Sequence, residues 1–206
     1  TGGASDVTNV DVTCVTSTFT IGGTVTGLLG SGLVLQNNGG DDLPIGADGS
    51  FQFATPIASG STFEVTVLTQ PAAPTQTCTV SGGTGTVGAS NVTSVAINCT
   101  TNRYLIGGTI SGLAGTVTLQ NNGSDNLDLT SNGTFAFATP VPSGATYSVI
   151  VKTQPTAPSQ TCTVTAGSGT VTSANVTSVV VTCTTNRYNI GGTLVGLAAG
   201  NSITLR

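Results

Sequence analysis

Three amino acids are missing from this chain, and charged residues are scarce. Its 206 residues include no His, Met or Trp, only 6% are charged and only 4% are aromatic. The lack of His removes the side chain that proteins use most often as a general base and as a metal ligand. A Ser nucleophile would therefore have no His partner. For these reasons we expect no enzyme, no cofactor and no metal site.

Basic residues and long apolar runs are also rare. The only basic side chains are Arg103, Lys152, Arg187 and Arg206, and the formal net charge is −4. Four dispersed cations cannot form the positive patch that binds nucleic acid or an anionic membrane surface. No run of about 18 apolar residues occurs, so we expect no membrane span in this segment.

Small, β-branched and polar residues make up most of the chain. The hydrophobic fraction is 37%, and Val, Ile and Thr recur throughout. These residues fit the half-buried surface of a pleated sheet, which argues against disorder.

The sequence repeats itself. Ile21-Gly22-Gly23-Thr24 returns as residues 106–109 and again as residues 190–193. Phe53-Ala54-Thr55-Pro56 returns 84 residues later, as residues 137–140. One small domain per repeat fits this period. The predicted units are the closing strand of a preceding repeat (1–18), two repeats (19–103 and 104–187) and the opening strands of a following repeat (188–206).

The two partial copies expose apolar strand positions if they stand alone. These positions are Val7, Val10, Val12, Cys14, Ile190, Leu194, Leu197, Ile203 and Leu205. An unpaired strand edge invites pairing with another chain. We therefore expect both segments to be completed by further repeats in a linear assembly. A continuous polypeptide is favoured, and subunits that exchange strands are the alternative.

Five cysteines follow the repeat. Cys78 and Cys99 lie 21 residues apart, as do Cys162 and Cys183, and Cys14 occupies the position of Cys99 and Cys183. Two disulfides, one in each repeat, are predicted, with a partner for Cys14 outside the segment. Buried free thiols are the alternative, whereas zinc is disfavoured because CxxC and His are both missing. Disulfides imply an oxidising compartment, so we expect an extracellular or cell-surface location.

Apolar residues alternate with polar ones, which is typical of strands. Asp48-Gly49 and Asn132-Gly133 are predicted hairpin turns, because Asn, Asp and Gly adopt positive φ readily. No helix signal occurs, so the expected fold is an all-β array of seven-stranded sandwiches. The predicted strands of the first full repeat are 19–27, 32–37, 42–46, 51–54, 62–69, 76–81 and 91–99, and the predicted disulfide joins the last two.

The repeat resembles a known family. Its motifs are Gly-Gly-Thr-Val-x-Gly-Leu, Leu-Gln-Asn-Asn-Gly, Gly-Ser-Phe-x-Phe and Asn-Val-Thr-x-Val-x-Ile-x-Cys. Together they are similar to bacterial immunoglobulin-like repeats of large secreted or surface proteins, and the first two-thirds also resembles prealbumin-like domains related to the carboxypeptidase regulatory domain. The resemblance covers the whole chain and implies spacers, stalks and fibre modules with no catalytic residues.

Acidic and amide residues in two matching loops are the main candidates for chemistry. Asp41 and Asp42 match Asp125 and Asn126, with Asp48 and Asn132 nearby. Oxygen ligands of this kind bind Ca²⁺, but Pro44 stands where the second copy has Asp128. We expect these residues to shape turns instead. A carboxylate-pair hydrolase fails because Asp42 becomes Asn126, and an isopeptide fails because Lys152 becomes Leu68.

Two functions are compatible with these features. The first is a structural module of an extracellular bacterial fibre, stalk or matrix filament, in which each repeat contacts its neighbours. The short junction that runs from Cys99 to Tyr104 favours a stiff array. The alternative is an adhesin-type module that binds a glycan or a host surface, for which Tyr104 and Tyr188 are the only aromatic candidates outside the predicted cores.

Overall fold

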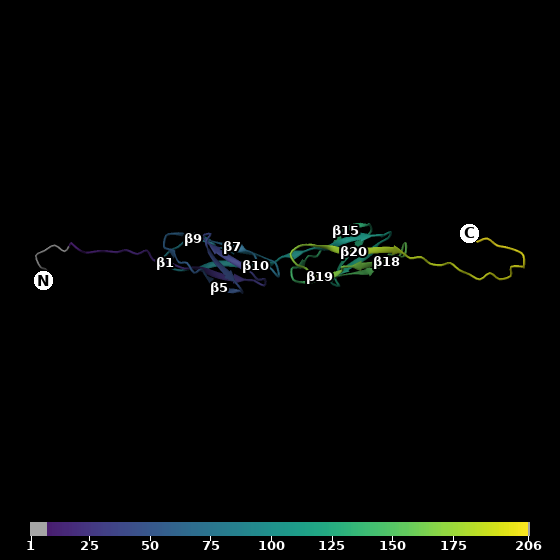
Figure 1. The fold of residues 1–206 in the computed structure, drawn as a ribbon, viewed down its shortest axis with the longest axis horizontal. Coiled ribbons are helices and arrows are strands. Elements are labelled where there is room, and N and C mark those ends of the chain that lie inside the picture. The colour runs from purple at the N-terminus through teal and green to yellow at the C-terminus, as the bar shows by residue number, and fades with distance from the viewer. Residues whose placement is uncertain (1–7, 206) are drawn as a thin grey trace.

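The computed structural model describes residues 8–205 and confirms an all-β chain. Within that span every regular element is a strand, and the strands form two similar units that lie end to end (Figure 1). The described residues contain no helix that could span a membrane.

Each unit contains ten strands, three of them very short. The first unit consists of β1 (Thr18–Phe19), β2 (Ile21–Thr26), β3 (Leu33–Asn37), β4 (Asp41–Ile45), β5 (Gly49–Gln52), β6 (Ile57–Ala58), β7 (Thr62–Thr69), β8 (Gln76–Ser81), β9 (Thr84–Thr86) and β10 (Val92–Thr101). The second unit consists of β11 (Arg103–Tyr104), β12 (Ile106–Ser111), β13 (Val117–Asn121), β14 (Asp125–Leu129), β15 (Gly133–Ala136), β16 (Val141–Pro142), β17 (Thr146–Thr153), β18 (Gln160–Thr165), β19 (Ser168–Thr170) and β20 (Val176–Thr185).

Each unit consists of two four-stranded sheets and one two-stranded sheet, which is β1-β6 in the first unit and β11-β16 in the second. In the first unit the four-stranded sheets have the orders β5-β2-β10-β8 and β4-β3-β7-β9, and the second unit repeats both as β15-β12-β20-β18 and β14-β13-β17-β19. Neighbouring strands are antiparallel except β2 with β10, and β12 with β20, which run parallel. The first and last long strands of a unit are therefore neighbours.

A single apolar cluster fills each unit. The first cluster receives Ile21 and Ile97 from one sheet and Leu35 and Val65 from the other, and all four side chains are buried. Phe51 and Phe53 meet edge to face inside it. Apolar side chains from two facing sheets give a sandwich-like core, as the alternating pattern indicates.

Each predicted strand corresponds to an observed one, but the hairpin prediction is wrong. Gly49 does adopt positive φ, at 137°. The strands on either side of the turn, β4 and β5, nevertheless belong to different sheets. The Asp48-Gly49 turn therefore carries the chain across the sandwich, and the Asn132-Gly133 turn does the same between β14 and β15.

The recurring Ile-Gly-Gly-Thr motif has a packing reason. A Cβ on Gly23 would lie 1.7 Å from the carbonyl oxygen of Val95 in β10, and a Cβ on Gly108 would meet Val179 in the same way. Only glycine lets the two parallel strands approach this closely.

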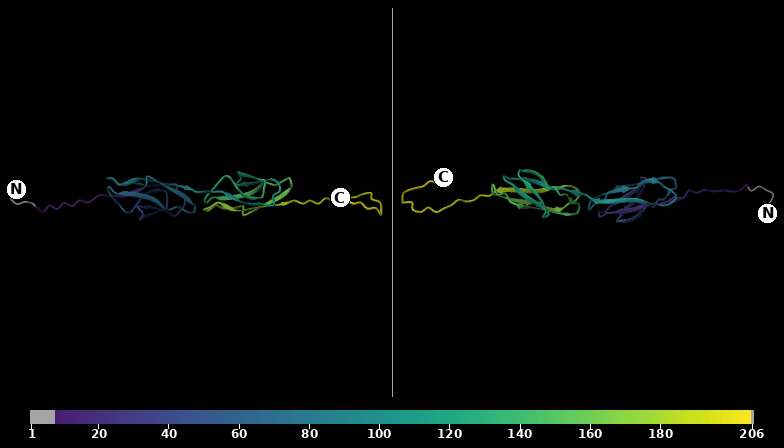
Figure 2. Two further views of the ribbon diagram at one scale, coloured as in Figure 1. Left: turned by 90° about the horizontal axis from the view of Figure 1, so that it is seen from above. Right: turned by 180° about the vertical axis from the view of Figure 1, so that it is seen from behind.

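Both flanking segments extend away from the ends of the two units (Figures 1 and 2). Residues 8–17 and 186–205 form no strand, and their apolar side chains are exposed, including Val10, Val12, Ile190 and Leu205. Of the apolar positions expected in these segments, Val7 lies outside the described residues, as does the cation Arg206. The described part of both segments therefore leaves apolar side chains open to solvent.

Candidate functional site

Two disulfides join the strands that the sequence predicts. Cys78 in β8 is bonded to Cys99 in β10, and Cys162 in β18 to Cys183 in β20. In each pair the cysteines are direct cross-strand partners within one sheet. Cys14 is free and exposed within the described part of the chain. The two bonds indicate a non-reducing environment.

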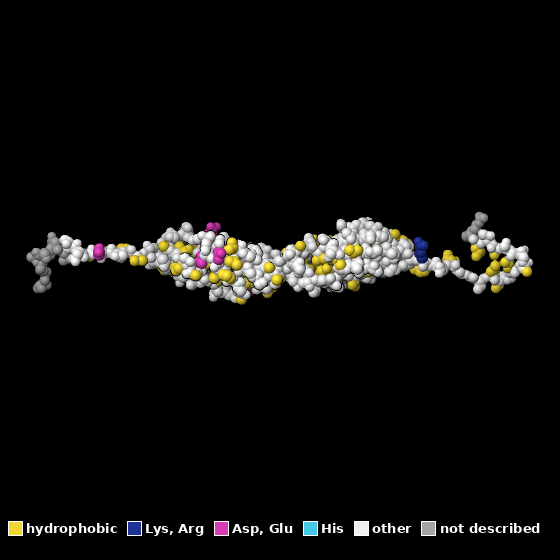
Figure 3. All heavy atoms as spheres, viewed as in Figure 1, with side chains coloured by type: hydrophobic (Ala, Val, Ile, Leu, Met, Phe, Trp, Pro, Cys, Tyr) yellow, Lys and Arg dark blue, Asp and Glu magenta, His cyan; other side chains and the backbone are white. Residues whose placement is uncertain are grey.

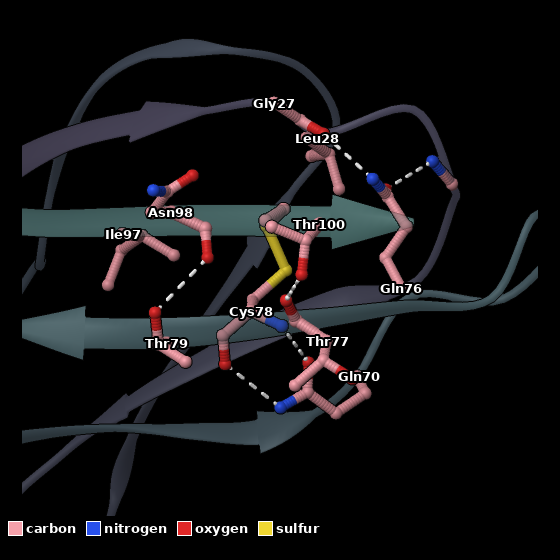
Figure 4. The surroundings of a disulfide bond; sticks show 12 residues. Gly27, Leu28, Gln70, Gln76, Thr77, Cys78, Thr79, Ile97, Asn98 and Thr100 are labelled. Carbon is pink, nitrogen blue, oxygen red and sulfur yellow. Dashed lines mark hydrogen bonds between the residues drawn. A yellow bond between two sulfur atoms is a disulfide. The ribbon is translucent and has the colours of Figure 1, made fainter. Parts of the chain in front are cut away.

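A glutamine side chain covers the open edge of β8 beside the disulfide (Figure 4). The Cys78 backbone N–H donates to Gln70 Oε1 at 2.7 Å, and Gln70 Nε2 donates to the Cys78 carbonyl at 3.1 Å. Gln154 makes the same two bonds with Cys162. The amide thus takes the place of a neighbouring strand at one edge position, which an exposed edge needs to avoid pairing with other chains.

A second glutamine is buried on the other side of the disulfide. Gln76 is 2% exposed, and its Oε1 accepts from the backbone N–H groups of Leu29 and Gly30 at 2.7 and 2.8 Å. Its Nε2 donates to the carbonyl of Gly27 at 2.7 Å. Gln160 holds the matching loop of the second unit, with bonds to Ala114 and Gly112. One amide therefore fixes a whole loop against β8 and β10.

We expect removal of one disulfide to weaken only its own repeat. Replacing Cys78 and Cys99 together with alanine should lower the free energy of unfolding of the first repeat by about 3 kcal/mol, because the loop it closes spans 21 residues. Urea unfolding followed by backbone NMR would report the two repeats separately. A matching loss in the second repeat, or no change in either, would contradict this expectation.

The two repeats meet in a hydrogen-bonded contact, called the joint and made by Thr75, Asn102, Tyr104 and Ser143. The Thr75 N–H donates to Ser143 Oγ at 3.0 Å, and the hydroxyls of Thr75 and Tyr104 lie 3.1 Å apart. The Asn102 N–H donates to the Thr75 carbonyl at 3.0 Å, while the Ser143 N–H donates to the Asn102 carbonyl at 2.8 Å. The connecting residue Asn102 thereby binds both repeats at once.

The joint also packs closely. A Cβ on Gly144 would lie 3.3 Å from the Cβ of Pro74, so the proline ring rests on the glycine. Ser143 is 6% exposed and also donates to the Thr172 carbonyl. A mainly apolar groove of about 590 Å³ runs beside the joint, between residues 72–75 and 170–173. The repeats are therefore in direct contact and not tethered by a free linker.

Tyr104→Phe is expected to loosen the joint without unfolding either repeat. The change removes the phenol hydroxyl and its contact with Thr75, worth about 1 kcal/mol. Residual dipolar couplings should then show a wider range of angles between the repeats. Phe already occupies the equivalent position 19, so the ring itself is tolerated. An unchanged distribution of angles would show that the hydroxyl plays no part.

The acidic loop residues hold backbone groups. Asp48 accepts from the N–H groups of Gly27 and Leu28 at 2.9 and 2.7 Å, and Asn132 accepts from Leu113 at 2.8 Å. Asp41 and Asp125, which begin the strands β4 and β14 and do not lie in loops, each accept from a threonine N–H at 3.0 Å. Among residues 8–205, no three His, Cys, Asp or Glu side chains gather as metal ligands would.

Charged side chains are few on the surface. In the view of Figure 3 uncharged polar side chains and backbone cover most of both repeats, with isolated charged groups. The outward positions of the sheet β5-β2-β10-β8 are all uncharged, as in Thr24, Asn98 and Thr79. Glu64 stands on the other sheet.

The structure separates the two tyrosines that the sequence singles out together. Tyr104 is half-buried in the joint, whereas Tyr188 is 75% exposed at the far end of the second repeat. The joint residues Thr75 and Ser143 are 68 positions apart, and no local pattern joins them. The sequence shows Gln76 and Gln160 as recurring residues two positions before a cysteine. No sequence pattern indicates that their side chains are buried.

Comparison with known proteins gave no matching family model and no matching curated protein.

Proposed function

We propose that this chain is a structural module of an extracellular bacterial fibre, stalk or matrix filament built from tandem immunoglobulin-like repeats. The observation that carries the proposal is the joint. It binds one repeat directly to the next through Thr75, Asn102, Tyr104 and Ser143. Repeats that contact only their neighbours, through a fixed interface, extend into a linear array.

Three further features support this function. Each repeat carries its own disulfide, which suits a protein that works outside the cell. The side chains of Asp41, Asp48 and Asn132 accept hydrogen bonds from backbone N–H groups, so the proposal gives them a structural role and includes no catalytic step. The sequence resemblance to bacterial immunoglobulin-like repeats points to the same class of protein.

Electron microscopy of the native material tests the proposal. Purified from its source under non-reducing conditions, the protein should appear as thin filaments with a regular axial repeat, one bead for each sandwich. Dispersed compact particles at the same concentration would refute a fibre or stalk role.

An adhesin-type module remains the second candidate, on the strength of one exposed aromatic ring, that of Tyr188. Sugar-binding proteins present such rings to the apolar face of a pyranose. Binding to a glycan array that disappears in Tyr188→Ala would favour it. Tyr104 does not support this function in the same way, because its ring is half-buried in the joint.

A further inference from the structure

The far end of the second repeat carries one half of a joint that has no neighbour. Ser159, Asn186 and Tyr188 occupy the positions of Thr75, Asn102 and Tyr104. The hydroxyls of Ser159 and Tyr188 lie 3.2 Å apart, and the Asn186 N–H donates to the Ser159 carbonyl at 3.0 Å. Together with Pro158, these residues form what we call the donor end.

The opposite end of the molecule carries the other half. Ser59 and Gly60 occupy the positions of Ser143 and Gly144. The Ser59 N–H donates to the Ser17 carbonyl at 2.9 Å and its hydroxyl donates to Gly88 at 2.7 Å. The Gly60 N–H donates to the Val87 carbonyl at 2.8 Å. The second repeat shows the same pattern. The Ser143 N–H donates to the Asn102 carbonyl and its hydroxyl to the Thr172 carbonyl, and the Gly144 N–H donates to the Val171 carbonyl. We call Ser59, Gly60 and Val87 the acceptor end.

The two ends are less covered than the joint. Ser143 is buried in the joint, but Ser59 is exposed. Pro74 is half-buried in the joint, but Pro158 is exposed. The side chains are already held in the bonded arrangement by their own repeat, so docking requires little further ordering.

We infer that the donor end is a docking site for another copy of this repeat, which begins at residue 188 and places its own serine and glycine on Ser159 and Pro158. This inference rests on the proposed tandem array and names the contact that repeats along it. The donor end and the acceptor end are then the two halves of one interface, used head to tail. A head-to-tail contact of this type stays open at both ends.

The partner is the next repeat of the same polypeptide and not a separate molecule. In the joint, Asn102 passes between the repeats and binds both of them. At the free ends this place is already taken, by Asn186 at one end and by Ser17 at the other. If two separate chains docked, the segment with Asn186 and the segment with Ser17 would both have to occupy the place that Asn102 alone fills in the joint.

The interface is not the same at both ends. Position 19, which corresponds to Tyr104 and Tyr188, is Phe. A joint formed at the acceptor end therefore lacks the hydroxyl pair seen between Thr75 and Tyr104. We expect that joint to be the looser of the two, with a docking equilibrium about fivefold less favourable, as the loss of one hydrogen bond of about 1 kcal/mol gives.

A chain extended after Arg206 by a copy of residues 121–187 tests the docking. Residues 188–206 and the copied segment together make a third full repeat. Residual dipolar couplings should give the second and third repeats the same relative orientation as the first and second. A third repeat that is folded, with its own disulfide formed, yet tumbles independently of the second would overturn the inference.

Two matched variants of the extended chain sharpen the test. Ser143→Ala in the copied segment removes the acceptor for the Ser159 N–H and should release the third repeat. Ser178→Ala in the same segment changes an exposed strand position and should leave the orientation fixed. Equal behaviour of the two variants would exclude a joint at the donor end.

The mirror extension, a copy of residues 104–169 placed before Thr1, gives an independent result if the first extension does not fold. The restored repeat should dock on Ser59, more loosely than in the joint, and a freely moving repeat would overturn the inference there. Failure of docking leaves the microscopy of native filaments untouched. Absence of filaments, in turn, would refute the proposed function while a docked third repeat still stood.

Discussion

Gly23→Ala is expected to abolish folding of the first repeat while the second repeat stays native. The new Cβ would lie 1.7 Å from the Val95 carbonyl oxygen and within 2.9 Å of two further backbone atoms of that residue. Backbone atoms cannot turn aside as a flexible side chain can, so β2 and β10 must separate. We expect a loss above about 4 kcal/mol, at the extreme of single substitutions.

The repeat itself supplies the controls for this experiment. Gly40→Ala places a Cβ where no atom lies within 4 Å, and it should change stability by less than about 0.5 kcal/mol. Gly108→Ala should reverse the outcome, with loss of the second repeat alone. Amide spectra of the 206-residue chain would show which repeat keeps its dispersed signals. Native signals from both repeats in Gly23→Ala would disprove the packing argument.

Gln76→Ala is expected to have the next largest effect, a loss of about 3–5 kcal/mol in the first repeat. The substitution leaves the N–H groups of Leu29 and Gly30 and the carbonyl of Gly27 without their partner, and each unpaired buried group costs about 1–3 kcal/mol. Water reaching the opened space would recover part of the loss.

Gln52→Ala is the matched control, because Gln52 is an exposed glutamine on β5 of the same sheet. It should be nearly neutral. Urea unfolding of both variants, read by far-ultraviolet circular dichroism and by amide exchange of residues 27–30, would measure the difference. Equal stability of the two variants would mean that the Gln76 amide does not hold the loop.

The sequence permits prediction of the strands and the disulfides because both have local signatures. Alternation marks β7, with Phe63 and Val65 buried and Glu64 exposed, and equal spacing marks the cysteine pairs. The sequence does not predict β9, because all three of its residues, Thr84–Thr86, are small and exposed and therefore show no alternation of buried and exposed side chains. The two-residue strands β1 and β6 are too short for any pattern.

Contacts between distant residues could not be predicted from local patterns. The parallel pairing of β2 with β10 joins strands 71 residues apart, and alternation says which face is buried but not which strand lies beside it. For this reason the local pattern at Asp48 predicts a hairpin that the structure does not contain. The joint depends likewise on loops whose residues look like ordinary turn formers until Thr75 and Ser143 are seen together.

The parallel pairing of β2 with β10 determines how the protein responds to being pulled. Tension along the chain enters a repeat at the start of β2 and leaves at the end of β10, which are opposite ends of one ladder. The hydrogen bonds between the two strands are then loaded in shear, all at once, instead of being opened one after another. Should a repeat give way, the bond between Cys78 and Cys99 keeps the intervening residues from extending. That shortens the released length by about 70 Å, at roughly 3.5 Å for each residue held back. A filament of such repeats would resist stretching until whole domains yield, and each yielding domain would release less chain than a domain without the disulfide.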